Sequence, residues 1–423
     1  MNIQATTRVL LLVGFVMTVY ICPAQHRESA QQTINTLCSE AFSGRGYVNK
    51  GDSVASNYIA KRMRDMGLKG YRPDFLNPFL LNVNTFSRTQ VKVDNKDLRP
   101  GLDYIVAPEA QSAEGKYKVF YVSPKLLSST KAVKKVKSAI KKGFIPVLCS
   151  YEATNKVLAE NAAKIKKSLS GAVFIQLKSS LTWSVATSQS KNTEIELLDS
   201  MFDRYSSEIS VSIKAVFMND YVSQNVIGYV PGLEKPDSFI ILCAHYDHLG
   251  KMGNVTFYGA NDNASGIATM LDLATYFVNH PQRYSILFIA FGGEEAGLIG
   301  SLNYVRKPVV PLANTRFVFN MDLMGSGDKG ATIVNGSIYK NEYEALTKIN
   351  TEKEYLPVIK SRGKAANSDH YFFTEAGVPS FFIYLMGDYS FYHSPNDSPD
   401  NLHLGEYYDK SFRLIRDFIV YLN

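Results

Sequence analysis

The chain has 423 residues, of which 45% are hydrophobic and 20% are charged, and its net charge is +7. This composition is ordinary for a globular protein and excludes a largely disordered chain. Because the length exceeds that of one ordinary domain, we expect a large core domain and a second module.

Residues 1–24 are predicted to be a secretory signal. Arg8 is the only charge before residue 26, and residues 9–22 form an apolar run that is shorter than the about 20 residues needed to span a bilayer. Pro23-Ala24-Gln25 follows, so we expect cleavage near Ala24. The chain is therefore expected to be exported, periplasmic or extracellular, without stable membrane insertion. A lipid anchor at Cys22 is the less favoured alternative, because Ile21 stands where lipoprotein signals have a small residue.

Three cysteines remain after this segment: Cys38, Cys149 and Cys243. Their odd number and irregular spacing argue against a disulfide framework. Cys243 lies within an apolar run, which predicts a buried thiol.

Residues 26–70 are expected to be mainly helical. The segment GDSVASNYIAKRM places Val54, Tyr58, Ile59 and Met63 on one stripe, and Gly67 ends the helix.

Residues 91–220 are expected to form a separate inserted α/β domain. Strand-like runs (KVFYV, FIPVLC, AVFIQL) alternate there with lysine-rich helical stretches, and eleven lysines lie between residues 125 and 167. Val133, Val136 and Ile140 recur at helical spacing between those lysines, which predicts a solvated helix face. No aromatic pattern accompanies the charge, so we expect no nucleic-acid partner.

From residue 225 the chain contains short, strongly apolar runs that fit strands buried on both faces of a mostly parallel sheet. The runs are SFIILCAH, YSILFIAF, RFVFNMD, GATIVN and PSFFIYLM. Amphipathic helices are expected over residues 265–280 and 405–422. We therefore predict a three-layer α/β/α core domain from residues 25–90 and 221–423, interrupted by the insertion.

Ligands of open α/β sheets bind beyond the carboxyl ends of the strands, so the polar residues after each apolar run are the candidate site. His245 and Asp247 follow one run, and residues at this spacing on an extended chain face the same way. Asp247 suits the role of orienting His245 as a metal ligand. Asp262 stands where an amphipathic helix begins, which is also an ordinary N-cap position.

Further acids and a histidine follow the other runs. Glu294 and Glu295 come directly after YSILFIAF, Asp322 ends RFVFNMD, and His393 follows PSFFIYLM in a Pro- and Asn-rich loop. Each of these has an ordinary explanation by itself. Together, two histidines and three carboxylates with one spare glutamate match the needs of two metal ions that share Asp262 and leave a position for water.

These segments resemble the family of two-zinc aminopeptidases that also contains plasma glutamate carboxypeptidase, the glutaminyl cyclases and the transferrin receptor ectodomain. The resemblance rests on AHYDHLG, YGANDNASG, FGGEEAGLIGS, NMDLMG, SDHYFF and YHSPNDSPDNL, in the family order over about residues 225–423. NTLCSEAFSGRG and the helix after it also look like the family's N-terminal segment. The insertion looks like the protease-associated domain of many members, although only its strand and helix order matches.

The resemblance implies two Zn²⁺ ions and a role for each motif residue. His245 and Asp322 would hold one zinc, His393 and Glu295 the other, and Asp262 would bridge them. Glu294 would be the general base, and Asp247 would orient His245. Tyr392 matches a position where some members stabilise the oxyanion, and Asp369 and His370 look like a structural element of the family.

The expected reaction is the hydrolysis of N-terminal residues from peptides. A carboxypeptidase or dipeptidase on the same metal core is the main alternative. A glutaminyl cyclase is disfavoured because Tyr392 replaces the tryptophan typical of that branch, and a receptor-like ectodomain because every ligand position is filled. The acidic cluster suits a substrate ammonium group. The basic residues near the motifs that could instead hold an α-carboxylate are Lys251, Arg283, Arg316, Arg362 and Lys364. The sequence does not specify an oligomeric state.

Overall fold

The computed structural model describes residues 23–152 and 154–423; residues 1–22 of the predicted signal, which include Cys22, lie outside this part of the chain. Its helices are α1 Pro23–Leu37, α2 Gly51–Asp65, α3 Pro124–Leu127, α4 Ala132–Lys141, α5 Lys156–Ser168, α6 Ser265–Asn279, α7 Ile299–Arg306, α8 Lys340–Lys353, α9 His370–Glu375 and α10 Glu406–Leu422. No described helix is both long and apolar enough to cross a membrane.

The strands comprise a central set, which positions the site, and a second set in the inserted region. The central strands are β1 Lys69–Gly70, β2 Leu76–Val93, β9 Glu208–Val230, β10 Lys235–His245, β11 Gly250–Met252, β12 Val255–Phe257, β13 Tyr284–Phe291, β14 Thr315–Asp322, β15 Ala331–Val334, β16 Ile359–Arg362 and β17 Ser380–Leu385. The inserted region adds β3 Lys96–Asp97, β4 Tyr104–Val106, β5 Ala113–Val122, β6 Phe144–Leu148, β7 Val173–Lys178 and β8 Thr193–Leu198.

The central sheet has the order β2-β9-β13-β10-β14-β17-β15-β16. Its middle strands β13, β10, β14 and β17 are parallel, so their carboxyl ends meet at one edge. The flanking strands β9 and β15 run antiparallel to their inner neighbours. The five strands expected from the apolar runs are all present, and the fold is mixed α/β with a large, mostly parallel sheet, as predicted.

Helices cover both faces of this sheet because alternate residues of its buried strands point to opposite sides. Ile240 and Leu242 pack into a core with residues of α1, α2, α6 and α10. Ile241 and Cys243 pack on the other face, against Tyr304 of α7 and the α9 residue Phe373. Cys243 is fully buried, as expected, and Cys38, Cys149 and Cys243 are all free thiols.

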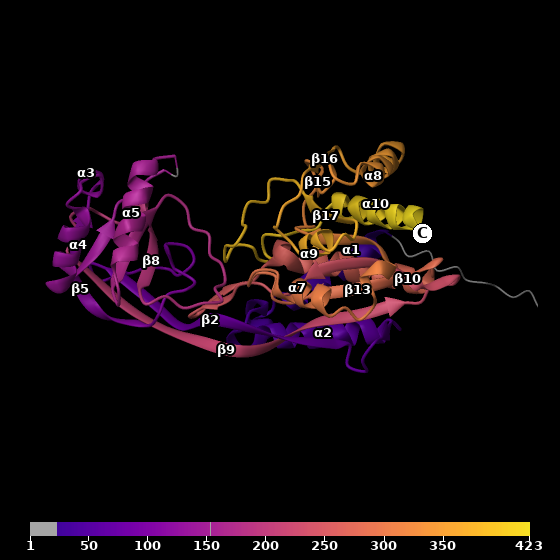
Figure 1. Cartoon of the computed structure of the whole chain (residues 1–423), viewed down its shortest axis with the longest axis horizontal. Helices are drawn as coiled ribbons and strands as arrows, with labels where there is room; N and C mark the ends of the chain where they lie inside the picture. Colours follow the sequence, from indigo (N-terminus) through magenta and orange to yellow (C-terminus); the bar gives the residue numbers. More distant parts are fainter. Residues whose placement is uncertain (1–22, 153) are drawn as a thin grey trace, which may run out of the picture.

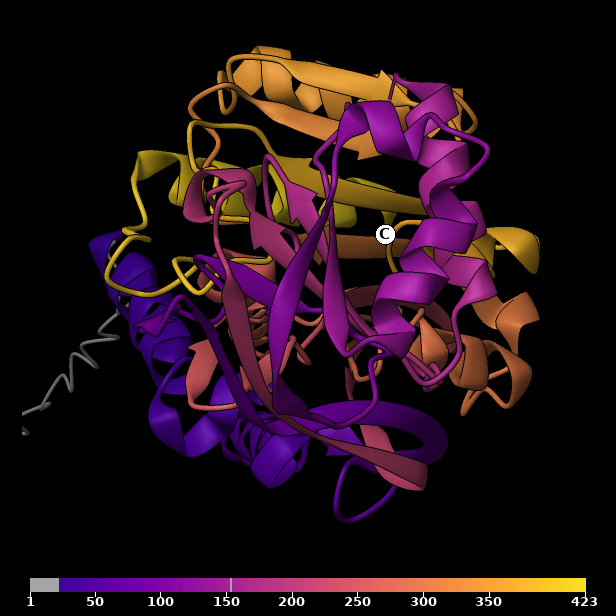
Figure 2. The ribbon, with the colours of Figure 1, turned by 90° about the vertical axis from the view of Figure 1, so that its left-hand side faces the viewer.

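The inserted region forms a second lobe, built from β3–β8, α3–α5 and the far ends of β2 and β9. β2 and β9 pair continuously from Leu76↔Val226 to Val93↔Ile209, so one long two-stranded ribbon reaches from the central sheet into the second lobe (Figure 1). β5 pairs with β9 and continues the sheet of this lobe through β6, β7, β8 and β4. Figure 2 shows this lobe in front of the central sheet.

The helix predictions hold with one exception. On α4, Val136 is fully buried, and Val133 and Ile140 are partly buried against the same core, which confirms the amphipathic interpretation. On α2, Ile59 and Met63 are fully buried. Val54 is 38% exposed, so its placement on the buried stripe was wrong, and the smaller Ala55 occupies that side of the helix.

A buried carboxyl group joins α6 to α10. Asp272 is 4% exposed, and its Oδ2 accepts a hydrogen bond of 2.6 Å from the Tyr408 hydroxyl. Burial raises the pKa of Asp272 to about 7, although the Tyr408 hydrogen bond acts in the opposite direction. The folded protein therefore binds this proton more tightly than the unfolded chain does, and the resulting stability is lost as pH rises through about 7.

We predict that Asp272→Asn removes this pH dependence, because an amide keeps an acceptor for Tyr408 without a buried charge. Between pH 5 and pH 8, the free energy of unfolding of the wild type should fall relative to that of the variant by on the order of 2 kcal/mol. Urea denaturation at several pH values measures this difference. Tyr408→Phe keeps the carboxyl group and should retain the pH dependence; parallel profiles for wild type and Asp272→Asn would contradict the prediction.

Candidate metal centre

The structure brings the five predicted ligands and Glu294 together at the edge where the parallel strands end. His245 is the last residue of β10 and Asp322 the last of β14. Glu294 and Glu295 follow β13, and His393 lies in the loop after β17. Asp262 lies between β12 and α6, in a short segment with non-helical backbone angles rather than at a regular N-cap.

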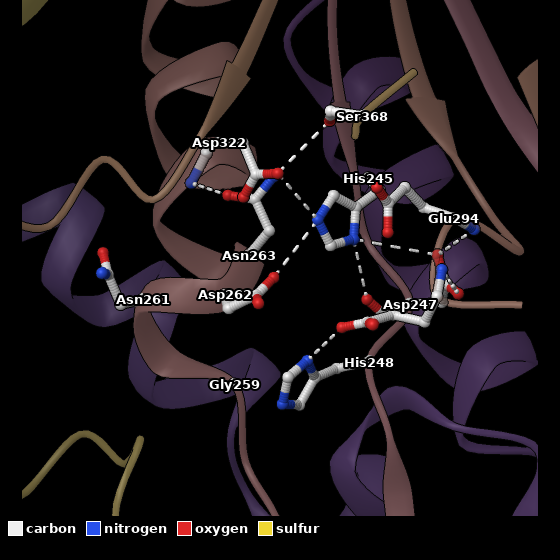
Figure 3. Close-up of polar contacts among 12 residues, drawn as sticks. His245, Asp247, His248, Gly259, Asn261, Asp262, Asn263, Glu294, Asp322 and Ser368 are labelled. Atoms are coloured by element: carbon white, nitrogen blue, oxygen red, sulfur yellow. Dashed lines mark hydrogen bonds and ion pairs between the residues drawn. The ribbon is translucent and has the colours of Figure 1, made fainter. Parts of the chain in front are cut away.

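Asp262 lies between the two histidines and contacts each with a different oxygen. His245 Nε2 is 3.3 Å from Asp262 Oδ1 and 3.4 Å from Asp322 Oδ2. His393 Nε2 is 3.3 Å from Asp262 Oδ2 and 3.3 Å from Glu295 Oε2. Figure 3 shows His245 facing both Asp262 and Asp322. The arrangement has two halves, each with one histidine and one terminal carboxylate, joined by a shared carboxylate.

The two adjacent glutamates point to different halves of this arrangement. The Glu295 carboxylate contacts His393, and it can share a ligand set with His248 and Asp262. The Glu294 carboxylate lies instead with His245 and Asp322, all three ligand atoms being within 4.8 Å of one another. Burial raises the pKa of Glu294 well above its usual range, and Glu295 and Asp369 add to this effect.

The site concentrates negative charge in a buried position. The side chains of His245, Asp262, Glu295 and Asp322 are each at most 9% exposed. Within residues 23–152 and 154–423, the ion-pair partners of these carboxylates are histidines, with no lysine or arginine in range. Burial lowers the pKa of His393, but Glu295 and Asp262 outweigh it and raise that pKa to about 11. Such a cluster demands cationic charge, and its nitrogen and oxygen donors suit divalent zinc.

The predicted role of Asp247 needs correction. The His245 ring Nδ1 is 3.1 Å from the main-chain carbonyl of Asp247, whereas the Asp247 carboxylate is 3.9 Å away. The ring therefore donates its second N–H to the carbonyl. The carboxylate accepts hydrogen bonds from the main-chain N–H groups of Glu294 at 3.1 Å and Glu295 at 3.3 Å. Asp247 thus orients His245 through its backbone and fixes the glutamate pair through its side chain.

His248 is a member of the site that residue spacing did not single out, although it lies in the same motif as His245. Its Nδ1 is 2.8 Å from Glu295 Oε1, and the side chain is fully buried. The segment before Asp262 must pass very close to this ring. A Cβ at Gly259 would meet the His248 ring at 2.5 Å, and the positive φ of +60° also requires glycine.

Arg45 holds the two loops that carry His245 and Asp262. Its side chain is fully buried, and its guanidinium donates to the carbonyls of Tyr246 at 2.8 Å, Tyr258 at 2.6 Å and Gly259 at 2.7 Å. Sequence reasoning noted the SGRG segment only for its resemblance. Arginine suits this position because its planar group offers several N–H donors in fixed directions.

Asp397 supports the same Asp262 segment from the other side. It accepts hydrogen bonds from the main-chain N–H groups of Asn261 at 2.8 Å and Asp262 at 3.0 Å, and from the Tyr389 hydroxyl at 2.8 Å. The two main-chain donors fix the direction from which Asp262 enters the site.

The second lobe contributes directly to the site through Trp183. Its main-chain carbonyl is 2.7 Å from His393 Nδ1, which leaves Nε2 to face Asp262 and Glu295. The Trp183 indole is 4% exposed, donates to the carbonyl of Val106 at 2.9 Å, and packs on Phe257 with ring centroids 4.7 Å apart. The single tryptophan therefore anchors the carbonyl that orients a candidate ligand.

Tyr392 and the SDH segment also lie next to the ligands. The Tyr392 ring stacks on His393 with centroids 3.9 Å apart, and its side chain is 55% exposed. Ser368 donates to Asp322 Oδ2 at 3.3 Å, and Asp369 and His370 are fully buried behind it. These contacts place the SDH segment in support of Asp322.

Comparison with known proteins finds relatives of the part of the chain that carries this site. The sequence model of peptidase family M28 matches residues 225–419, the part that carries all six central residues. Residues 225–419 form a peptidase family M28 domain. The chain is 33% identical over 211 residues to aminopeptidase YwaD of Bacillus subtilis, a match that covers 46% of this chain and 43% of that protein. The chain spans less than half the length of the curated relatives it matches.

Solved structures with a similar fold match almost the whole chain and not only the M28 domain. A zinc aminopeptidase from Bacillus subtilis, BSAP, superimposes with a TM-score of 0.69 at 22% identity, covering 93% of this chain and 94% of that chain. A peptidase M28 precursor from Shewanella amazonensis gives a TM-score of 0.65 at 14% identity, covering 95% and 97%. These likenesses extend well beyond residues 225–419, so they include the fold of the second lobe.

We predict that Trp183→Ala weakens zinc binding at the His393 half of the site about tenfold and leaves the His245 half unchanged, because alanine keeps the main-chain carbonyl but loses the indole contacts that hold it against His393. Competition with a chromophoric chelator measures the two affinities separately. Trp183→Phe preserves most of the packing on Phe257 and should stay near the wild type. Two unchanged affinities in a correctly folded Trp183→Ala protein would contradict the prediction.

Proposed function

We propose that this chain is a zinc-dependent aminopeptidase with two Zn²⁺ ions. The observation that carries the proposal is Asp262, whose two oxygens each lie 3.3 Å from a different histidine. In the proposed site, His245 and Asp322 would hold one ion, His393 and Glu295 would hold the other, and Asp262 would be shared between the two halves. The similarity to aminopeptidase YwaD and to the zinc aminopeptidase BSAP supports both the metal and the reaction.

Glu294 is the proposed general base. Bound zinc supplies Lewis-acid chemistry, lowering the pKa of water and polarising a carbonyl group. Glu294 takes the proton from the attacking water and delivers it to the leaving amine. Its buried carboxylate with a raised pKa suits proton transfer near neutral pH. Tyr392 remains protonated, because desolvation and the neighbouring carboxylates raise its pKa, and its hydroxyl can donate to the developing oxyanion.

The charges around the site favour recognition of a free amino terminus. Spare carboxylate oxygens in a buried position can hold a substrate ammonium group by charge-assisted hydrogen bonds. An α-carboxylate would need a cation, and most basic residues considered from the sequence are unsuitable. Lys364 contacts Glu375, Arg283 is paired with Glu234, and Arg316 lies over the Tyr284 ring. Tyr284 begins β13, at the opposite end from the metal centre.

The competing activities have less support. A glutaminyl cyclase would be expected to have tryptophan before the last ligand histidine, where this chain has Tyr392. A carboxypeptidase or dipeptidase on the same metal core remains the main alternative, and a substrate with a blocked end separates it from an aminopeptidase. A receptor-like protein without activity is disfavoured because competent ligands fill both halves of the site.

We further propose the domain division and the location of the protein. Residues 25–90 and 221–423 form the catalytic domain, and residues 91–220 form a protease-associated-like domain, in agreement with their parallel strands β5–β8 covered by α3–α5. Residues 1–24 act as an export signal, so the enzyme works on peptides outside the cytoplasm.

We predict that Glu294→Gln lowers kcat at least about 100-fold while both zinc ions stay bound, because the base is not a ligand. Metal analysis of the purified variant, together with its rate, checks this. Glu295→Gln is the matched control and should lose one zinc. Loss of zinc from Glu294→Gln with retention in Glu295→Gln would show that the two roles are exchanged.

Acetylation of the substrate's amino terminus should abolish cleavage, because it removes the ammonium group that the carboxylates bind. A good peptide substrate, its acetylated form and its C-terminally amidated form are compared by mass spectrometry, with and without chelator. The amidated peptide should be cleaved normally. Continued removal of the C-terminal residue from the acetylated peptide would replace the aminopeptidase proposal with the carboxypeptidase alternative.

A further inference from the structure

A pocket of about 340 Å³ opens beside the metal centre, and none of the roles assigned above uses it. Asn261 and Tyr392 form part of its wall, and they are the immediate neighbours of the candidate ligands Asp262 and His393. The ends of β14 and β17, the loops that follow these two strands and the edge strand β16 supply the rest. A cavity in this position suits the side chain of the substrate residue next to the scissile bond.

The strand register connects the metal centre to a lysine across this pocket. Asp322 pairs with Tyr384, Tyr384 pairs with Thr332, and Thr332 pairs with Lys360. Residues directly opposite one another on neighbouring strands project from the same face of a sheet. The row therefore runs from a candidate zinc ligand to Lys360 over three interstrand spacings, about 14 Å. The four-carbon stem of lysine lets its ammonium group cover part of that distance.

Lys360 supplies a positive charge that the pocket's own residues leave uncompensated. The pocket's other cation, Lys329, contacts Asp388 and is thereby paired. The one carboxylate in the described lining of the pocket, that of Asp397, already accepts hydrogen bonds from two main-chain N–H groups and from the Tyr389 hydroxyl. Lys360 has no ion-pair partner among the residues that the structure describes. The remaining polar lining, including Ser326 and Tyr384, offers hydroxyl donors.

We propose that this pocket binds the side-chain carboxylate of an acidic N-terminal residue, with Lys360 as the residue that determines this specificity. The inference rests on the aminopeptidase function proposed above and names its substrate class. A carboxylate entering the pocket would meet one free ammonium group and the Tyr384 hydroxyl, which can form charge-assisted hydrogen bonds to it. Glutamate fits better than aspartate, because the longer side chain spans more of the distance between the metal centre and Lys360.

The test compares glutamyl, glutaminyl and leucyl p-nitroanilides on the zinc-loaded full-length protein. Glutamate and glutamine have the same shape and differ in charge, so their ratio of kcat/KM reports the charge recognition. We expect the wild type to favour glutamyl over glutaminyl substrate about tenfold. Lys360→Gln should reduce this ratio to about one, and the leucyl rate of each variant serves as the reference for its general activity. Lys340→Gln, on the exposed start of α8, is the matched control and should retain the wild-type ratio.

The possible results separate this inference from the proposed function. The proposed acidic pocket is overturned if the wild type hydrolyses the leucyl substrate but shows no preference for glutamyl over glutaminyl substrate. It is also overturned if that preference is unchanged in Lys360→Gln. Neither result contradicts the proposed aminopeptidase function. If Lys360→Gln impairs only the cleavage of dipeptides with a free C-terminus, Lys360 binds the substrate's α-carboxylate. That result also overturns the proposed acidic pocket. Failure of the wild type to cleave any of the three anilides overturns both proposals.

Discussion

The buried carboxylates are the constraint on which the rest of this structure depends. Asp247, Asp262, Glu294, Glu295 and Asp322 are gathered at one edge of the sheet, and histidines are their only ion-pair partners in the described chain. An uncompensated group of this kind would be strongly unfavourable. Two divalent cations would balance most of the charge. Bound zinc would relieve this cost, and the geometry of the cluster divides into two halves around Asp262.

The supporting residues act mainly on the backbone of the ligand-bearing loops. Arg45 binds three carbonyls on the loops of His245 and Asp262, while Asp397 binds the N–H groups of Asn261 and Asp262. Asp247 fixes the turn that separates Glu294 from Glu295. Each contact restrains the direction of a ligand rather than touching the metal position. Such restraint matters because a catalytic site needs its groups held close to their working positions.

The sequence predicted the central sheet and the residues brought together at its edge, because parallel strands are marked by apolar runs and their ends by polar residues. His245, Glu294, Glu295, Asp322 and His393 follow that pattern, whereas Asp262 was predicted from its place at the start of an amphipathic helix. Arg45, Trp183 and Lys360 were not predicted to belong to the site. The contacts of Arg45 and Trp183 involve main-chain carbonyls and join residues that lie far apart in the sequence. No spacing between motif residues could therefore have indicated these contacts. Lys360 reaches the pocket only through the register of strands β14, β17, β15 and β16. Val54 was misplaced because its apolar side chain lies at the margin of the buried stripe.

The contact between the Trp183 carbonyl and His393 has a consequence for how the enzyme matures during synthesis. Trp183 is translated long before His393, and it belongs to a lobe whose core is formed largely by residues 86–213. The acceptor therefore belongs to a lobe that precedes its partner in the chain. His245, Asp262, Glu295 and Asp322 also precede His393, so an early chain holds one complete half of the centre and an open second half. The His393 half of the centre is therefore completed only when the C-terminal loop reaches the carbonyl of Trp183.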